Sequence, residues 1–270
     1  MAPTRFERSG SRHRFTARRA TVRSVARPAE GVVRVTFAGP DFADFASDGP
    51  ADHIRLFFPD EATGEYRHPV PAEDGDGIVR PDGPTINRDY TPLAPRREDG
   101  GGAVDVDFME HAHPGPATRW ALSARPGDEL VIVGPRGSKR APADVDGLLA
   151  IVDETALPSL TRWLDALPAG APATVVVATG HDEGWVRGYL GPRATTVHVV
   201  DPGEALVDAV AALPTIGDGT FVFGAGEAGA LAAVRRHLFR DRGLPAEQVA
   251  ISGYWRRGEA GFDHHTPLPE

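Results

Sequence analysis

The sequence contains no cysteine among its 270 residues, and this excludes several kinds of redox chemistry. Disulfide exchange, thiolate catalysis and cysteine-ligated iron–sulfur clusters all need a sulfur atom that this chain does not supply. Any electron transfer by this protein must therefore use a cofactor that it binds. A chain without cysteine also agrees with a reducing compartment, and we expect a cytoplasmic protein.

Long apolar runs and an excess of positive charge are also missing. No stretch reaches the roughly 18 to 20 apolar residues that a membrane-spanning helix needs, and the first twenty residues contain arginines without an apolar segment. We therefore expect neither membrane insertion nor a secretory signal. Because 38 acidic residues outweigh 29 basic ones, the net charge is −9, which argues against nucleic-acid binding. We expect a monomer.

The first half of the chain has the pattern of an antiparallel β-barrel. Short β-rich runs are separated by clusters of Gly, Pro and Asp, as in barrels and sandwiches. A Pro-, Gly- and acid-rich segment over 59–84 is expected to be a long loop between strands. The expected strands are Ala20–Val25, Val32–Phe37, His53–Phe58, Arg88–Leu93, Val104–Met109 and Glu129–Val133.

The second half alternates apolar runs with helix-like segments. This alternation is typical of a parallel sheet covered on both faces, and predicts a doubly wound domain whose ligands bind beyond the carboxyl ends of its strands. The expected strands are Leu148–Val152, Thr174–Ala178, Thr196–Val200, Thr220–Phe223 and Val249–Ser252. The expected helices are Thr155–Leu167, Asp182–Leu190, Gly203–Leu213 and Glu227–Arg242.

The sequence thus predicts four segments. We expect a flexible tail over 1–14, a β-barrel over 15–142, a doubly wound α/β domain over 143–258 and a C-terminal tail over 259–270. The polar end of the chain, with His264 and His265, is assigned to that last tail. A barrel followed by a doubly wound sheet is an arrangement suited to holding two planar cofactors edge to edge.

The run Arg88-Asp89-Tyr90-Thr91-Pro92 lies on an expected strand that follows the long loop. Alternation along a strand places Arg88 and Tyr90 on one face. A guanidinium binds phosphate, a phenol ring covers a flat heterocycle, and a hydroxyl bonds its polar edge. An ordinary surface strand with a salt bridge explains the same run, so this motif alone identifies no site.

A second motif places a turn before a helix that begins near Pro116, a favoured first helical residue. Backbone amides at such a helix start accept a pyrophosphate, and Thr118 adds a hydroxyl. The alternative is an N-capped helix that packs Trp120 and Leu122 into the end of the barrel. His111 and His113 have no third ligand at a recognisable spacing, so we expect no metal site there.

Further motifs follow these two in a fixed order along the chain. The full set is Arg88–Pro92, Asp105–Phe108, His111, Gly115–Ala121, Pro126–Asp128, Gly134–Ser138, Asp153–Pro158, Ala225–Glu227 with Arg235 and Arg236, Gly253–Arg256, and Gly258. Together they resemble the siderophore-interacting family of FAD-dependent ferric-siderophore reductases, within the ferredoxin reductase-like superfamily. The resemblance covers about residues 15 to 258 and rests on the order of the pieces.

The resemblance implies FAD as cofactor, NADH or NADPH as co-substrate and a ferric siderophore as acceptor. Because the flavin carries the chemistry, no catalytic residue of the protein is required. The implied cofactor-binding residues are Arg88, Asp89, Tyr90, Thr91, Asp107, His111, Gly115, Pro116, Ala117, Thr118, Asp153, Glu154, Thr155, Ala225, Gly226 and Glu227. Arg136, Lys139, Arg140, Trp255, Arg256 and Arg257 are candidates for contacting an anionic ferric chelate, or are ordinary solvated surface residues.

Two positions depart from the family pattern. Val152 and Ala112 stand where glycine is common, and each adds a side chain near an expected cofactor. Acidic residues in the run 181–183 favour NADH slightly, while Arg187 and Arg193 leave NADPH open. Two other functions remain as alternatives: a flavin reductase with a different acceptor, and a module that binds ferric siderophore without turnover.

Overall fold

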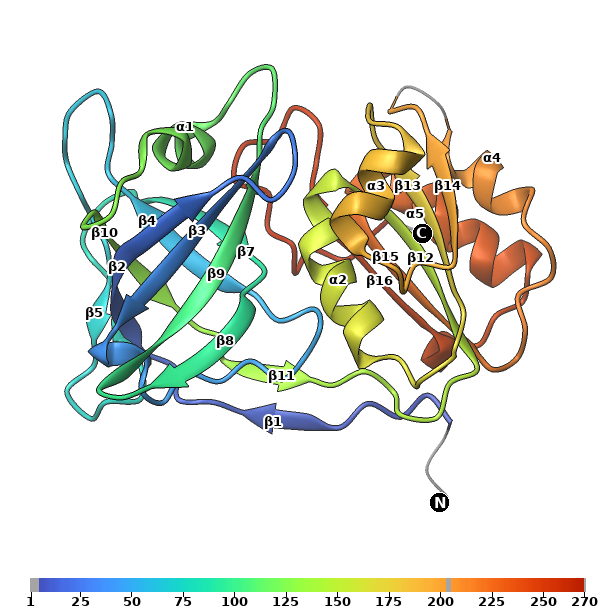
Figure 1. Cartoon of the computed structure of the whole chain (residues 1–270), viewed down its shortest axis with the longest axis horizontal. Helices are drawn as coiled ribbons and strands as arrows, with labels where there is room; N and C mark the ends of the chain where they lie inside the picture. Colours follow the sequence, from blue (N-terminus) through green and yellow to red (C-terminus); the bar gives the residue numbers. More distant parts are fainter. Residues whose placement is uncertain (1–4, 203–204, 270) are drawn as a thin grey trace. The chain divides into compact units, whose positions relative to one another are not determined.

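The structure is a computed structural model that describes residues 5–202 and 205–269 (Figure 1). Its contacts divide the chain into two compact units. Residues 10–140 form the first, which we call the barrel domain. The described residues before 10 and after 140 form the second, which we call the α/β domain. None of the described helices is long and apolar enough to cross a membrane.

The barrel domain is built on one seven-stranded antiparallel sheet. Its end strands follow each other in sequence, so the chain passes from one edge of the sheet to the other through Thr91 and Pro92. Each of these two end strands is therefore paired with another strand of the sheet on one side only. In spatial order the strands are β7 (Ile86–Tyr90), β4 (Ile54–Phe58), β10 (Glu129–Val133), β2 (Ala17–Ala26), β3 (Val32–Gly39), β9 (Gly101–Met109) and β8 (Leu93–Glu98).

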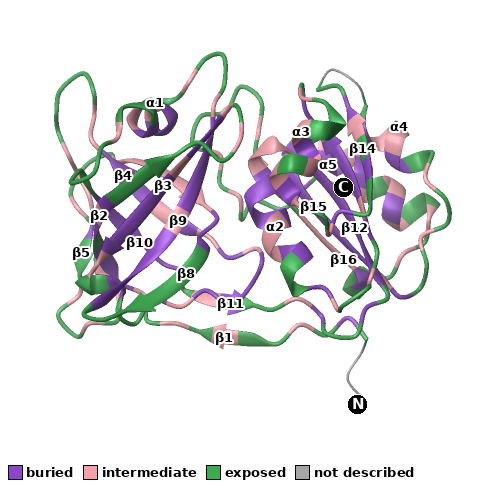
Figure 2. Ribbon diagram, viewed as in Figure 1, coloured by how far each residue is buried: buried purple, intermediate pink, exposed green. Residues whose placement is uncertain are grey.

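Strand alternation explains the core of the barrel domain. Val33, Val35 and Phe37 on β3 are buried in the core, while Arg34 and Thr36 between them lie on the outer face. Many of the buried residues of this domain accordingly lie on its strands (Figure 2).

Helix α1 (Pro116–Ser123) covers one end of the barrel core. Ala117 and Ala121 belong to that core, and the Trp120 ring stacks on Phe37 with centroids 6.0 Å apart. The expected packing into the barrel end is confirmed for Trp120 but wrong for Leu122, which is exposed.

The α/β domain contains a five-stranded parallel sheet in the order β14-β13-β12-β15-β16. Helices α2 and α3 cover one face, and α4 and α5 cover the other. The predicted fold class, an N-terminal antiparallel barrel followed by a doubly wound parallel sheet, is confirmed. The elements are β12 (Gly147–Asp153), α2 (Leu157–Ala166), β13 (Ala173–Ala178), α3 (Glu183–Leu190), β14 (Thr196–Val200), α4 (Leu206–Ala211), β15 (Thr220–Glu227), α5 (Ala228–Arg236) and β16 (Val249–Trp255).

Both expected tails differ from the structure in their described parts. Phe6 is buried against Phe221, with ring centroids 6.0 Å apart, and β1 (Gly10–Arg12) pairs with β11 (Gly137–Lys139). At the other end, Leu268 is buried in the core of the α/β domain. Phe6 and Leu268 thus anchor parts of the two expected tails. Residues 1–4 and 270 lie outside the described residues.

Some element boundaries also differ from the predictions. The single strand expected over 88–93 is two strands, β7 and β8, because Pro92 has no amide for the ladder. The long loop over 59–84 contains the two-residue strands β5 (Val70–Pro71) and β6 (Ile78–Val79). Helix α4 is shorter than expected, and residues 203–204 of that prediction are not described.

Candidate functional site

Strand β7 carries two candidate side chains on the inner face of the barrel sheet. Arg88 is paired with Leu56 and Tyr90 with Ile54, and both of these aliphatic residues belong to the core. Directly paired residues project to the same face, so Arg88 and Tyr90 share it. The Arg88 guanidinium donates one hydrogen bond, of 2.6 Å, to the carbonyl oxygen of Asn87 and has no carboxylate partner among the described residues. This leaves a cation available to an anionic ligand.

The rest of the motif is fixed by the barrel itself. Asp89 accepts two hydrogen bonds from the Arg55 guanidinium, of 2.8 and 2.7 Å, and so is committed to an ion pair. The Tyr90 ring packs on Phe108, with centroids 4.4 Å apart. Burial raises the pKa of Tyr90, against the opposing charge of Arg88, so the phenol is neutral at physiological pH. Thr91 is buried.

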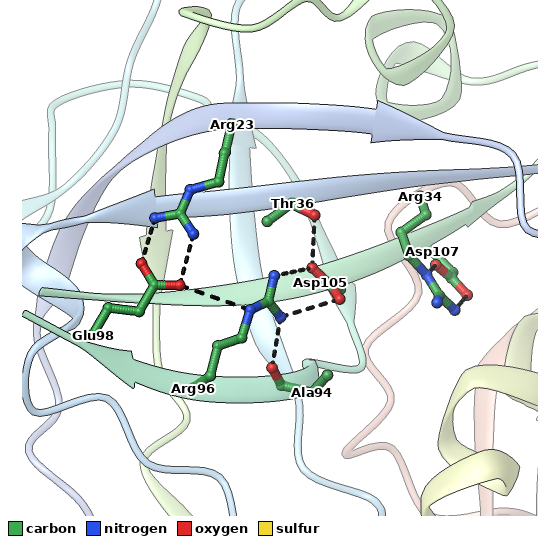
Figure 3. Close-up of polar contacts among 8 residues, drawn as sticks. All are labelled: Arg23, Arg34, Thr36, Ala94, Arg96, Glu98, Asp105 and Asp107. Atoms are coloured by element: carbon green, nitrogen blue, oxygen red, sulfur yellow. Dashed lines mark hydrogen bonds and ion pairs between the residues drawn. The ribbon is translucent and has the colours of Figure 1, made fainter.

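Asp107 lies on the outer face of the sheet. It is paired directly with Arg34 across β9 and β3, and the two form a bidentate ion pair of 2.6 and 2.7 Å (Figure 3). The Asp107 carboxylate is fully buried beneath that guanidinium. The structure therefore does not bring Asp107 together with Arg88 and Tyr90.

The first turn of α1 has no side-chain cap. Its cap residue, Gly115, makes no side-chain capping bond, and no acidic residue lies in the first turn. A side chain at Gly115 would meet open space, so the approach to the first-turn amides is clear. By contrast, α3 and α5 are capped by Asp182 and Glu227. Uncapped amides and the positive end of the helix dipole favour a phosphate group at this position.

The other candidates around α1 fall into two groups. Ala117 and Thr118 have buried side chains, and the Thr118 hydroxyl lies 3.5 Å from the carbonyl oxygen of Met109. His111 and Ala112 are exposed in the preceding loop. The methyl group of Ala112 therefore takes up no space inside the barrel.

In the α/β domain, Asp153 joins three neighbouring strand ends. Its Oδ1 accepts hydrogen bonds from the amide and hydroxyl of Thr155, of 2.9 and 2.6 Å. Its Oδ2 accepts bonds from the Glu227 amide and the Trp255 indole, of 2.8 and 2.7 Å. Burial raises the pKa of Asp153, and these hydrogen bonds act in the opposite direction. One buried carboxylate thus ties β12 to the ends of β15 and β16.

Neighbouring acids extend this arrangement along the carboxyl edge of the sheet. Glu227 accepts hydrogen bonds from the amides of Ala230, at 2.7 Å, and Arg257, at 3.1 Å. Glu154 accepts a 2.5 Å bond from the Thr179 hydroxyl at the end of β13. The sheet order reverses between β12 and β15, so these residues line the switch point where a doubly wound sheet binds nucleotides. Ala225 lies buried between them.

Gly226 permits this close approach. Its φ is +148°, and a Cβ added to it would lie 2.6 Å from the Asp153 carboxyl carbon. We expect Gly226→Ala to lower the free energy of unfolding by roughly 1–3 kcal/mol, as measured by urea denaturation. Gly188→Ala is the matched control, because a Cβ on that helical glycine would meet no atom within 4 Å. Equal stability of the Gly226 variant and wild type would contradict the prediction.

Val152 does not stand on the ligand edge. It is fully buried in β12, between Val177 and Ala225 on the adjacent strands. Its side chain contributes to packing inside the α/β domain, so the departure from glycine places no bulk on the exposed carboxyl edge.

The basic candidates belong to different domains and are described separately. In the barrel domain, the Arg136 guanidinium lies 5.1 Å above the Phe15 ring, and Arg140 pairs with Asp48 at 3.0 Å. Lys139 lies on β11 and pairs with Gly10 through the backbone.

The second group of candidates follows the end of β16. Arg256 pairs with Glu259 at 3.3 Å and lies 4.8 Å above the Phe262 ring. Arg257 contributes its backbone amide to Glu227, and the Trp255 indole bonds Asp153. Trp255 is therefore part of the strand-end network, a role that the sequence did not indicate.

Comparisons with known proteins agree with both domain geometries. Residues 21–139 match the siderophore-interacting FAD-binding domain, and residues 145–258 match the siderophore-interacting protein model. The NADPH-dependent ferric-chelate reductase of Escherichia coli is 32% identical over 88% of this chain and 92% of its own length. The chain belongs to the siderophore-interacting protein family. The predicted family is confirmed, as is FAD as the cofactor of its barrel domain.

Two further relatives of this siderophore-interacting protein cover nearly the whole chain. The ferric vibriobactin reductase of Vibrio cholerae is 27% identical over 87% of this chain and 88% of its own length. The crystal structure of a siderophore utilization protein from T. fusca is 34% identical, has a TM-score of 0.83 and covers 96% of this chain and 100% of that one.

The residues of the barrel domain fit FAD. The dinucleotide needs a pyrophosphate site, a cation and an aromatic surface. The uncapped start of α1, the guanidinium of Arg88 and the neutral ring of Tyr90 supply them. Arg55, which holds Asp89, is a supporting residue that the sequence did not single out.

Proposed function

We propose that this protein is a ferric-siderophore reductase that passes electrons from NADH or NADPH through FAD to chelated Fe(III). The observation that carries the proposal is the pairing, in one chain, of an uncapped anion site on an FAD-type barrel with a nucleotide edge on a doubly wound sheet. The named activities of the E. coli and V. cholerae relatives, which align over most of the chain, support the ferric acceptor.

The barrel residues bind and orient the flavin cofactor. FAD supplies the step between a donor of two electrons and an acceptor of one. We assign the phosphates to the first-turn amides of α1 and to Arg88, whose cation lacks a carboxylate partner in the described chain. Tyr90 offers a neutral ring beside that cation, and Asp89 holds the strand through Arg55.

The carboxyl edge of the α/β sheet is the proposed site for the nicotinamide dinucleotide. Asp153 fixes the shape of this edge by joining three strand ends, and Gly226 leaves room for the close turn. The acids expected to select NADH are engaged locally, because Asp182 caps α3 and Glu183 pairs with Arg187 at 2.7 Å. Both coenzymes are therefore to be tested.

The acceptor follows from the chemistry of iron. Fe(II) is a softer ion than Fe(III), so a chelator with hard oxygen ligands holds it less tightly. One-electron reduction thus releases the metal without cleavage of the siderophore. Arg136 in the barrel domain and Arg256 in the α/β domain are separate candidate cations for attracting an anionic chelate.

The decisive experiment separates electron entry from electron exit. NADH or NADPH added anaerobically to the FAD-loaded protein should bleach the flavin absorbance, and ferric siderophore should then restore it. A ferrous-specific chelator should trap two Fe(II) for each nicotinamide oxidised. Failure to bleach with either coenzyme would support the non-catalytic binding module. Bleaching without reoxidation by any ferric chelate would support a different acceptor.

Loss of the Arg88 cation should weaken FAD binding. A charge-assisted hydrogen bond contributes about 1.5–3 kcal/mol, so Arg88→Ala should raise the Kd for FAD by about 10- to 150-fold. Flavin fluorescence titration of the apoprotein measures this. Arg97→Ala is the control, because Arg97 is an exposed arginine of the same domain, on β8. An unchanged Kd for the Arg88 variant would remove the phosphate assignment.

The proposal also includes a cytoplasmic location and a monomeric state. The cytoplasm contains the reduced nicotinamide dinucleotides on which the reaction depends. Sedimentation equilibrium of the FAD-loaded protein should give the mass of one chain, and a concentration-independent dimer mass would contradict the monomer.

A further inference from the structure

A strained backbone position lies just after the proposed flavin-binding strand. Ala94 has a φ of +43° and is the only non-glycine residue in the described chain with a left-handed backbone. It lies in a bulge between Leu93 and Arg96, where β8 and β9 change register. A left-handed conformation costs a residue with a Cβ about 1–2 kcal/mol, and such strain persists only where neighbouring groups enforce it.

The hydrogen-bond ladder between β8 and β9 does not hold Ala94 in its left-handed conformation. Leu93 pairs with Asp105 and Arg96 with Ala103, which leaves Ala94 and Pro95 without partners in the register. Pro92 and Pro95 have no amide hydrogen to donate. As β8 ends the sheet, no strand of that sheet lies on its other side. Between Leu93 and Arg96 the ladder register therefore gives the backbone no partner that would fix Ala94.

Arg96 supplies that restraint. Its Nη1 donates a 2.9 Å hydrogen bond to the carbonyl oxygen of Ala94 and lies 3.2 Å from Asp105 Oδ2, while its Nη2 donates a 3.0 Å bond to Asp105 Oδ1 (Figure 3). Asp105 is itself fixed, because it accepts a 2.7 Å bond from the Thr36 hydroxyl on β3. The Arg96 guanidinium thus links the carbonyl oxygen of Ala94 to Asp105 on β9 and, through Asp105, to Thr36 on β3.

Arg23 and Glu98 lie on the same outer face of the sheet as Arg96 and allow a comparison with it. Glu98 accepts hydrogen bonds of 2.7 and 2.5 Å from Arg23 and lies 3.9 Å from Arg96. Ion pairs this exposed contribute little to stability. Arg96 differs from Arg23 in its bond to the carbonyl oxygen of Ala94 and in its pair with Asp105.

We propose that Arg96 is a positioning residue for the flavin. By holding Ala94 in its left-handed conformation, it fixes the connection through Thr91 and Pro92, and with it the setting of Tyr90 at the flavin. The inference rests on the proposed FAD site in the barrel domain. According to this inference, hydrogen bonds on the outer face of the sheet help to position the flavin on its inner face.

The test compares FAD binding by the Arg96→Met variant with binding by the double variant that also carries Ala94→Gly. Arg96→Met should raise the Kd for FAD by about 5- to 30-fold, the equivalent of the strain that binding would have to restore. It should also shift the absorption maximum of the bound flavin, which reports the surroundings of its ring. Glycine adopts a positive φ without the Cβ penalty, so adding Ala94→Gly to Arg96→Met should recover most of the affinity and the wild-type spectrum.

The controls separate positioning from general charge loss. Arg23→Met removes a guanidinium from the same face and should leave both the Kd and the spectrum unchanged. Arg96→Lys keeps the charge but cannot bond the carbonyl and both carboxylate oxygens together, so it should shift the spectrum as methionine does, even if Arg96→Met fails to fold.

Three outcomes would overturn the inference. These are an unshifted flavin in both Arg96 variants, equal effects of Arg23→Met and Arg96→Met, and the absence of recovery with Ala94→Gly. All three presuppose a wild type that binds FAD, so they leave the proposed function intact. A wild type that binds no FAD would instead overturn the proposed function, and this inference with it.

Discussion

Arg18→Met should lower the free energy of unfolding by about 3–5 kcal/mol, the largest stability effect that we expect in the barrel domain. The Arg18 side chain is 2% exposed. It donates hydrogen bonds to the carbonyl oxygens of Asp41, Gly134 and Arg14, at 3.0, 3.3 and 3.4 Å, and to Asp44 at 3.1 Å. Methionine keeps the unbranched apolar stem of the side chain but leaves these acceptors without their donor.

The neighbouring residue provides the control. Arg19 is exposed, and its one hydrogen bond to Asp41 comes from the backbone amide, which any residue supplies. Arg19→Met should therefore change the unfolding free energy by less than about 0.5 kcal/mol. Guanidinium chloride denaturation followed by circular dichroism measures both variants. A similar loss in the two would show that the buried guanidinium has no special role in stability.

The Arg18 cluster also shows why burial and pairing must be considered together. Burial alone would raise the pKa of Asp44, but hydrogen bonds from Arg14 and Arg18 hold it below its ordinary value. Asp44 is thus ionised at neutral pH, and the cluster remains an ion pair.

Alternation of apolar residues was sufficient to predict most of the framework. Val33, Val35 and Phe37 alternate with polar residues and form a barrel strand, while the unbroken run over 148–152 forms a buried parallel strand. In both domains the period of the pattern sets which residues face the core, and that fixes the type of sheet.

The partners of charged residues could not be predicted in the same way. Asp107 pairs with Arg34 and Asp153 with Trp255, over sequence separations of 73 and 102 residues. A local pattern tells which face a carboxylate occupies but not which donor from another strand meets it. The sequence therefore indicated neither the ion pair of Asp107 with Arg34 nor the structural contribution of Trp255.

The strained bulge was equally hidden in the sequence. The pattern predicts one strand over 88–93, and it indicates neither the break at Pro92 nor the backbone conformation of Ala94. Only the contact of Arg96 with the Ala94 carbonyl shows that the break is held in one geometry. Arg96 follows the second proline in the sequence, but its hydrogen bonds to Ala94 and Asp105 are visible only in the structure.

Asp153→Asn should have the largest functional effect, because it replaces an acceptor-only group with one that must also donate. Both oxygens of Asp153 each accept two hydrogen bonds, from Thr155 at one side and from Glu227 and Trp255 at the other. In one orientation the NH2 group of asparagine faces the Glu227 amide and the Trp255 indole, and in the other it faces the Thr155 amide, so at least one N–H loses its acceptor. Each buried donor left unpaired costs about 1–3 kcal/mol, so the geometry that Asp153 fixes at the proposed nucleotide edge should be disturbed.

The consequence should appear in electron entry and not in flavin binding. We expect anaerobic flavin reduction by NADH or NADPH to slow by at least about tenfold, equivalent to 1.4 kcal/mol, in stopped-flow measurements. The Kd for FAD should stay unchanged, since its proposed site lies in the barrel domain. Asp165→Asn, on the exposed face of α2, is the control and should behave as wild type. A normal reduction rate in the Asp153 variant would show that the strand-end network does not shape the coenzyme site, whereas a parallel loss of FAD binding would point to general misfolding.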